Sequence, residues 1–378
     1  MDTTVAIVGG GPSGACLALI LAQRGFTVDV FEKRADPREA ESSSAAATTF
    51  GSAFGQSVDA AKRSINLALS CRGQAALRAV GTLETVMASA VPMTGRAIHP
   101  PDGGPLVYQP YGQPGEAIYS AQRGTVNNAL LAACDAHKGP GAVRLHFSHS
   151  FVSLSQDGKL EVADATGAKR SVHPALVVGA DGAFSAVRGA LLRHERVNFA
   201  RKFIPHAYKE LYIPASASGN AELDMFETLH IWPRTDFMLI ALPNLDKSFT
   251  LTLFVRLTQR YALDPPQRVR SGLSPDPQLA PHPPAPSPPP PSTPRQAPWA
   301  TFEGLDEAEQ KNDAADGVAA WFDRIFPDVA HLIPVRSACS SALEFYTVLA
   351  NHTPSPSPSS LPLVIDGAVA RKRNVIPS

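Results

Sequence analysis

The sequence has no excess of charge of either sign, since its 378 residues include 34 Lys+Arg and 34 Asp+Glu. Electrostatic capture of nucleic acid or of an anionic membrane is therefore not expected to be its main activity. It also lacks a run of about 18 apolar residues, the length that a membrane span requires. The closest approach, residues 15–21, is followed by Gln23 and Arg24. Asp2 stands where a secretory signal would carry basic residues. We therefore predict a soluble chain without such a signal.

Several motifs of other protein classes are also missing. No G-x-S-x-G or G-K-[ST] sequence occurs, which argues against an α/β-hydrolase and a P-loop nucleotidase. His146 and His149 have no third ligand nearby in the sequence, so we predict no metal site. Cysteine is scarce and never spaced as C-x-x-C, which predicts neither disulfides nor zinc and favours a reducing compartment. The cysteines are Cys16, Cys71, Cys134 and Cys339.

Near the N-terminus, the pattern predicts a strand, a glycine-rich turn, a helix and a second strand. Residues 5–8 are apolar, residues 9–14 read GGGPSG, an Ala/Leu-rich stretch runs to Arg24, and residues 27–31 again favour a strand. Such a unit typically begins a parallel sheet. A glycine-rich hairpin is the alternative, and the helical stretch disfavours it.

The glycine spacing and one acidic residue predict a dinucleotide-binding site. Gly9, Gly11 and Gly14 allow a tight turn and close approach of a pyrophosphate, and a helix N-terminus attracts that anion. Glu32 ends the second strand 18 residues after Gly14. A carboxylate there accepts hydrogen bonds from a ribose diol and disfavours a 2′-phosphate. The site therefore favours FAD or NAD over NADP.

The remaining strand and helix pattern predicts an α/β fold, with strands and helices up to about residue 195, a run of antiparallel strands over 196–258, and ordered residues again after a disordered Pro-rich insertion over 264–298. Within these spans we predict helices over 124–137, 185–188 and 317–326, and strands over 143–147, 151–154, 176–178, 211–213, 229–232, 237–242 and 249–255.

Several motifs together resemble the FAD-dependent aromatic hydroxylases: GGGPSG at 9–14, FEKR at 31–34, Arg123 and GADG at 179–182. Longer stretches are similar to the kynurenine 3-monooxygenase family within that group. They are RSINLALS at 63–70, PMTGRAIH at 92–99, YG at 111–112, IYS at 118–120, HAYKEL at 206–211 and HIWPR at 230–234. The similarity runs from about residue 5 to 254. It implies an FAD-binding Rossmann-like domain over 1–90 and 118–195, an antiparallel substrate-binding sheet over 91–117 and 196–258, and a degenerate C-terminal remnant over 299–378.

The resemblance implies an FAD-dependent monooxygenase that converts L-kynurenine to 3-hydroxy-L-kynurenine with NADPH and O2. It also implies a place in tryptophan catabolism and NAD biosynthesis and, in eukaryotes, at the mitochondrial outer membrane. Arg96 and Tyr111 match the pair that holds the substrate carboxylate, and no protein residue is predicted to be catalytic, because the flavin supplies the chemistry. Residues matched to the FAD site are Gly9, Gly11, Ser13, Gly14, Phe31, Glu32, Lys33, Arg34, Ala68, Arg123, Phe151, Asp181 and Gly182.

Some features leave alternatives open. Lys33 could equally be a solvated strand end, and His99, His206 and His230 are interpreted as hydrogen-bonded structural residues. The family's later Gly-Asp motif has only 363–367 as a counterpart, in the wrong order, so a C-terminally truncated chain is expected. The alternatives to an impaired kynurenine hydroxylase are a noncatalytic nucleotide-binding paralogue or fragment, and a flavin hydroxylase of another aromatic substrate.

Overall fold

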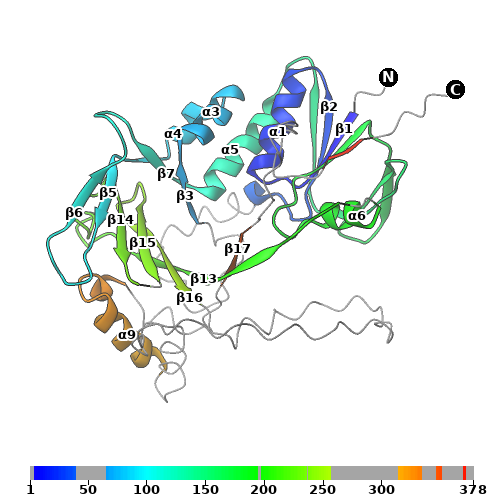
Figure 1. Cartoon of the computed structure of the whole chain (residues 1–378). Coiled ribbons are helices and arrows are strands. Elements are labelled where there is room, and N and C mark those ends of the chain that lie inside the picture. Colours follow the sequence, from blue (N-terminus) through cyan, green and yellow to red (C-terminus); the bar gives the residue numbers. More distant parts are fainter. Residues whose placement is uncertain are drawn as a thin grey trace, which may run out of the picture.

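The computed structural model describes residues 4–39, 65–194, 197–235, 237–256, 314–333, 346–350 and 369–371. The predicted insertion at 264–298 and the Asp-Gly sequence at 363–367 lie outside these residues. Figure 1 shows a parallel sheet with its helices at one end of the molecule and a large sheet at the other. None of the helices in the described part is long and apolar enough to span a membrane.

The parallel sheet contains the predicted strand, turn, helix and strand. β1 (Thr4–Val8) lies between β2 (Thr27–Phe31) and β12 (Leu176–Gly179), and β2 is followed by β8 (Ala142–His146), all in parallel. A short antiparallel strand, β18 (Val369–Arg371), completes the other edge beside β12. The helices α1 (Pro12–Gln23) and α5 (Arg123–Ala136) cover this sheet, which confirms the predicted α/β arrangement.

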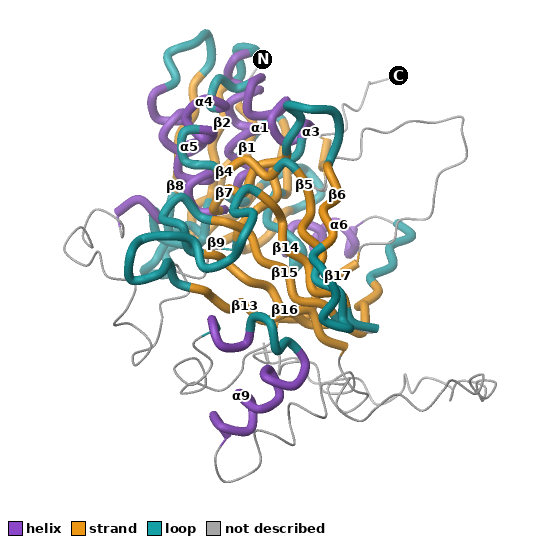
Figure 2. The backbone as a smooth tube through the Cα atoms, turned by 90° about the vertical axis from the view of Figure 1, so that its left-hand side faces the viewer, coloured by secondary structure: helices purple, strands orange, loops and turns teal. Residues whose placement is uncertain are grey.

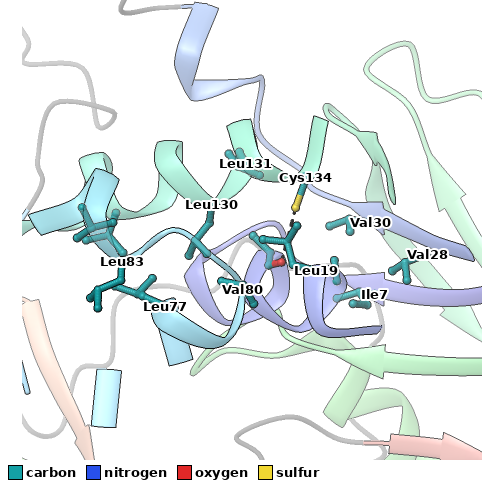
Figure 3. Packing of buried hydrophobic residues seen from close by; sticks show 14 of the residues in the cluster. Ile7, Leu19, Val28, Val30, Leu77, Val80, Leu83, Leu130, Leu131 and Cys134 are labelled. Carbon is teal, nitrogen blue, oxygen red and sulfur yellow. Dashed lines mark hydrogen bonds between the residues drawn. The ribbon is translucent and has the colours of Figure 1, made fainter. Parts of the chain in front are cut away.

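Small residues let the helices approach the sheet closely. Ala15, Ala18 and Ala22 of α1 are fully buried at helical spacing, and the Cys134 thiol of α5 donates to the Ala15 carbonyl at 3.6 Å. Figure 3 shows Leu19 of α1 among the apolar side chains of β1, β2 and α5. Two shorter helices, α3 (Cys71–Ala79) and α4 (Leu83–Met87), extend the same core.

Two small sheets flank the parallel sheet. The first has the order β3 (Asn66–Leu69), β7 (Ile118–Gln122) and β4 (Val91–Met93). The second has the order β11 (Lys169–Val172), β10 (Leu160–Ala163) and β9 (Ser150–Leu154), and α6 (Ala186–His194) packs against it. Because β4 pairs with β7, the first strand of the span 91–117 belongs to the small sheet.

The large sheet is mixed, whereas the sequence predicted an antiparallel one. Hydrogen bonds join β14 (Thr228–Pro233) to β5 (Gly95–Ile98) in parallel. Since these strands come from distant segments, no hairpin forces them to alternate in direction. The other neighbours are antiparallel, and the sheet order is β17 (Tyr346–Ala350), β13 (Lys202–Ile213), β16 (Phe249–Arg256), β15 (Met238–Pro243), β14, β5 and β6 (Val107–Pro110).

The two faces of the large sheet differ in what covers them. One face buries Trp232, Leu239 and Leu251 against Trp321 and Phe326, which belong to α9 (Ala314–Ile325) and the residue after it. A short 3-10 helix, η3 (Ala330–Leu332), continues this cover. Figures 1 and 2 place α9 on the side away from the parallel sheet. The opposite face carries the alternate side chains, which are half-buried at Leu229, Ile231, Ile240, Thr250 and Thr252.

Candidate nucleotide-binding site

The glycine-rich turn after β1 packs directly on the turn after β12. Gly9 has a φ of +110°, and a Cβ there would overlap the Ala180 carbonyl. A Cβ on Gly14 would overlap the Gly9 carbonyl oxygen. Both positions therefore require glycine. The first and last glycines of the motif build the turn.

Gly11 has a different role from its two neighbours in the motif. A Cβ on Gly11 would meet no atom within 4 Å, so open space lies over the start of α1. Gly11 is also the N-cap of α1, Pro12 follows it, and no side chain caps the first turn. Backbone N–H groups of that turn are therefore available to an anion. An uncapped first turn with open space above it is the kind of site that can bind a pyrophosphate.

Glu32 is held in place at the edge of this site. Its Oε2 accepts from the Gly10 N–H at 2.8 Å, and its Oε1 accepts from the backbone N and Nε of Arg34 at 3.0 and 2.9 Å. Burial raises the pKa of Glu32, but the hydrogen bonds from Arg34 and Gly10 outweigh it and leave the pKa below its ordinary value. Glu32 is therefore a fixed carboxylate, and its Oε2 keeps one lone pair that could accept from a ribose hydroxyl.

Asp181 has a role that the sequence did not predict. Its Oδ1 accepts from the Ser185 hydroxyl at 2.6 Å, and its Oδ2 accepts from the N–H groups of Ala186 and Val187 at 2.6 and 3.2 Å. The carboxylate thus caps α6, and Gly182, with a φ of +82°, lets the chain turn between them. A serine four residues after the aspartate, just before a helix, was the sequence signal for this cap.

The other residues matched to FAD fall into three groups. Phe31 is buried against the His146 ring at 4.8 Å, and Phe151 packs against the same core cluster. Ser13, Lys33 and Arg34 are exposed beside the turn and Glu32. Ala68 and Arg123 are exposed on or next to the small sheet of β3 and β7, where the Arg123 N–H donates to the Ile65 carbonyl at 3.2 Å.

The histidine pair singled out near β8 belongs to two separate contacts. Asp29 of β2 accepts from Arg144 at 2.8 and 2.7 Å, and its Oδ1 lies 2.8 Å from His146 Nε2. His149 Nδ1 contacts the Phe147 carbonyl at 2.7 Å. Within the described ranges, no group of three or more His, Cys, Asp or Glu residues is arranged to hold a metal ion.

The structure brings Arg96 and Tyr111 together. The guanidinium carbon of Arg96 lies 5.0 Å from the centre of the Tyr111 ring, and the Tyr111 N–H donates to the Thr94 carbonyl at 3.0 Å. Arg96 is exposed on β5, while Gly95 and Ala97 on either side are buried. The side chain therefore stands on the face of the large sheet that α9 does not cover.

A chain of polar contacts on the opposite face was only partly predicted. His99 Nδ1 lies 3.1 Å from Asp328 Oδ2, and His99 Nε2 lies 3.0 Å from His230 Nδ1. Trp232 donates to the same Asp328 oxygen at 2.6 Å and stacks on His99 with ring centres 4.0 Å apart. The prediction of hydrogen-bonded structural histidines is confirmed for His99 and His230. Asp328 joins the loop after α9 to the sheet.

Comparisons with known proteins identify the relatives of this chain. Residues 7–45 match a family described as an NAD(P)-binding Rossmann-like domain. A kynurenine 3-monooxygenase from Salinispora tropica is 42% identical over 272 residues, which are 70% of this chain and 55% of the relative. Over about 70% of its length, the chain is homologous to the kynurenine 3-monooxygenases.

Animal kynurenine 3-monooxygenases match as well. The enzyme of Anopheles gambiae is 40% identical over 68% of this chain and 49% of its own length, and that of Sus scrofa is 38% identical over 69% and 52%. The chain spans about half the length of these relatives. A mutant PqsL of Pseudomonas aeruginosa shares the fold, at 16% identity and a TM-score of 0.54 over 91% of this chain and 72% of its own.

Proposed function

We propose that this protein is an FAD- and NADPH-dependent monooxygenase that hydroxylates L-kynurenine to 3-hydroxy-L-kynurenine. One observation carries the proposal. This protein is about 40% identical to kynurenine 3-monooxygenases, and it brings Arg96 and Tyr111 together on the face of the large sheet that α9 does not cover. The same chain leaves the first turn of α1 uncapped beside a fixed Glu32. The first feature suits an amino-acid substrate, and the second suits a dinucleotide.

The residues around the turn fit the adenosine and pyrophosphate part of FAD. The N–H groups at the start of α1 would bind the phosphates, the space over Gly11 would admit them, and Glu32 would bind the ribose hydroxyls. When bound, FAD accepts a hydride from NADPH and activates O2 for transfer to an aromatic ring. The protein's contribution is to hold, orient and shield the reactants.

Arg96 and Tyr111 would hold the carboxylate of the substrate. A guanidinium can donate two parallel hydrogen bonds to a carboxylate, and a phenol can donate a third. The guanidinium lies over the Tyr111 ring, so the two side chains can contact the same carboxylate. Leu229, which pairs with Arg96, is half-buried on the same face and offers apolar contact to an aromatic ring.

The direct test is to incubate the purified chain with FAD, remove the excess, and record the flavin absorbance. Kynurenine-dependent oxidation of NADPH and the formation of 3-hydroxykynurenine are then measured. We expect retained flavin and product. Retained flavin without turnover would support the second candidate, a noncatalytic nucleotide-binding protein, which the uncapped first turn of α1 and the fixed Glu32 favour. Colourless protein would contradict FAD binding.

Arg96→Met is expected to raise the KM for kynurenine about 10- to 100-fold, because hydrogen bonds to a charged group contribute about 1.5–3 kcal/mol each. FAD content should stay unchanged, since Arg96 stands on the large sheet. Arg170→Met, an exposed arginine on strand β11, is the matched control and should alter neither value. Equal loss of FAD and of kynurenine affinity in Arg96→Met would contradict the assignment.

A further inference from the structure

A hydrogen-bonded network joins the small sheet of β3 and β7 to the turn between β15 and β16. The Asn66 amide of β3 donates to Ser120 Oγ of β7 at 3.0 Å and to Asn244 Oδ1 at 2.7 Å. Asn66 and Asn244 are 178 residues apart in the sequence. Asn244 and Ser120 are buried and Asn66 is half-buried, so water has limited access to this link.

The neighbouring groups fix the orientation of both amides. The Ser248 hydroxyl donates its one proton to Asp246, so its oxygen must accept from Asn244 Nδ2, which lies 3.0 Å away. Asn244 Nδ2 also faces Thr250 Oγ1 at 3.1 Å. The Asn244 oxygen therefore points to Asn66, which has to present its NH2 group. Asn244 Oδ1 therefore accepts a hydrogen bond from a donor at position 66, and an acceptor at that position would be repelled.

The network includes a buried polar atom without a partner, which destabilises the fold and which apolar packing would avoid. Asn66 Oδ1 is buried without a hydrogen-bond partner in the structure. A buried acceptor left unpaired costs about 1–3 kcal/mol. Apolar residues would join the two sheets without that cost, but such contacts would allow the sheets to shift relative to each other. Directional hydrogen bonds fix one relative position of the sheets. The cost is consistent with a need for fixed geometry between the sheets.

The network lies between the two halves of the proposed site. Asn66 is two residues before Ala68, and the carbonyl of the preceding Ile65 accepts from Arg123, which places it beside two residues matched to FAD. On the other side, β16 pairs with β15, β15 with β14, and β14 with β5, where Leu229 is opposite Arg96. Asn66 thus connects the cofactor side to the sheet that carries the carboxylate clamp.

We propose that Asn66 is a positioning residue that sets the distance between the flavin and the substrate by fixing the β15–β16 turn. This inference rests on the proposed function. Asn66→Asp puts a carboxylate oxygen against Asn244 Oδ1 and removes the donor, whereas Asn220→Asp makes the same amide-to-carboxylate change at an exposed position outside the network. Because a misplacement of about 1 Å can cost about 100-fold in rate, we expect kcat in Asn66→Asp to fall about 10- to 100-fold.

The expected pattern separates positioning from general damage. Asn66→Asp should retain FAD and release more peroxide per NADPH oxidised, while Asn220→Asp stays within about threefold of the wild type, because it leaves the network intact. Ser120→Ala, which spares the Asn244 link, is the second control. Asn66→Ala replaces Asn66→Asp if that variant does not fold. Equal kcat and coupling in the two aspartate variants would overturn the proposal.

A measurement that does not depend on turnover separates the proposed role of Asn66 from the proposed function. Hydrogen exchange of residues 243–249 is measured in the FAD-bound wild type and variants. Exchange there should accelerate about 10-fold in Asn66→Asp and stay near wild type in Asn220→Asp, even if no kynurenine is hydroxylated. Absent turnover with this exchange pattern would reject the proposed function alone. Equal exchange in both variants would reject the role of Asn66.

Discussion

Replacing Gly14 with alanine is expected to destabilise the fold by about 3 kcal/mol or more, because the new Cβ would overlap the Gly9 carbonyl. Both groups belong to the backbone and cannot rotate away. The better helix propensity of alanine, about 1 kcal/mol, does not offset the overlap. Gly11→Ala should leave stability nearly unchanged, since its Cβ enters open space.

Gly11→Ala should instead weaken FAD binding about 10- to 100-fold, because the methyl group holds the phosphates away from the N–H groups of α1. Thermal unfolding with and without FAD, together with the flavin retained after desalting, measures both effects. Gly189→Ala, inside helix α6 with its nearest atom 4.0 Å away, is the control and should be neutral or stabilising. Normal FAD binding by Gly11→Ala would refute the phosphate site.

Acidification from pH 6.5 to 5 is expected to remove about 2 kcal/mol of stability through His230 alone. Burial and the neighbouring His99 lower the pKa of His230 to about 3, against 6.5 in an unfolded chain. The unfolded state therefore binds the proton first, and stability falls as the pH drops below 6.5. Burial raises the pKa of Asp328, but the contacts with His99 and Trp232 lower it overall, so Asp328 loses its contribution only below about pH 4.

The test is chemical denaturation at pH 7, 6.5 and 5. His230→Asn keeps an amide donor near His99 but loses the packing of the buried ring, so its stability should be lower at pH 7. Because asparagine cannot titrate, that stability should change about 2 kcal/mol less between pH 6.5 and 5. His173→Asn, at an exposed position, should retain the wild-type slope. The same slope in His230→Asn and wild type would show that another group causes the loss.

The sequence predicted the parts of the fold that depend on neighbouring residues. The strands around Gly9–Gly14 and the helix at α1 follow from local spacing and are confirmed. The direction of β5 could not be predicted, since alternation of apolar residues is the same in parallel and antiparallel pairs. The same limit applies to β4, whose partner is β7.

In the candidate site, too, the sequence predicted only those features that depend on neighbouring residues. Glu32 was predicted from its distance to the glycines, and the structure places it on the Gly10 N–H. Asp181 was expected near the flavin because it matches a motif of the family. An aspartate after a strand also suits a helix cap, and only the position of α6 shows that Asp181 makes one. The contact of Asn66 with Asn244 arises from the meeting of two distant segments, so no local pattern contains it.

The cap on α6 also limits how a dinucleotide can lie. Two glycine-bearing turns meet at the same end of the sheet, after β1 and after β12, and each leads into a helix. The carboxylate of Asp181 already neutralises the start of α6, whereas the first turn of α1 has no side-chain cap, so of these two helices α1 is the one that would attract a phosphate. In the proposed site, the phosphates would therefore lie over α1 and the ribose beside Glu32 at the end of β2, which fixes the direction of the ligand along the sheet edge.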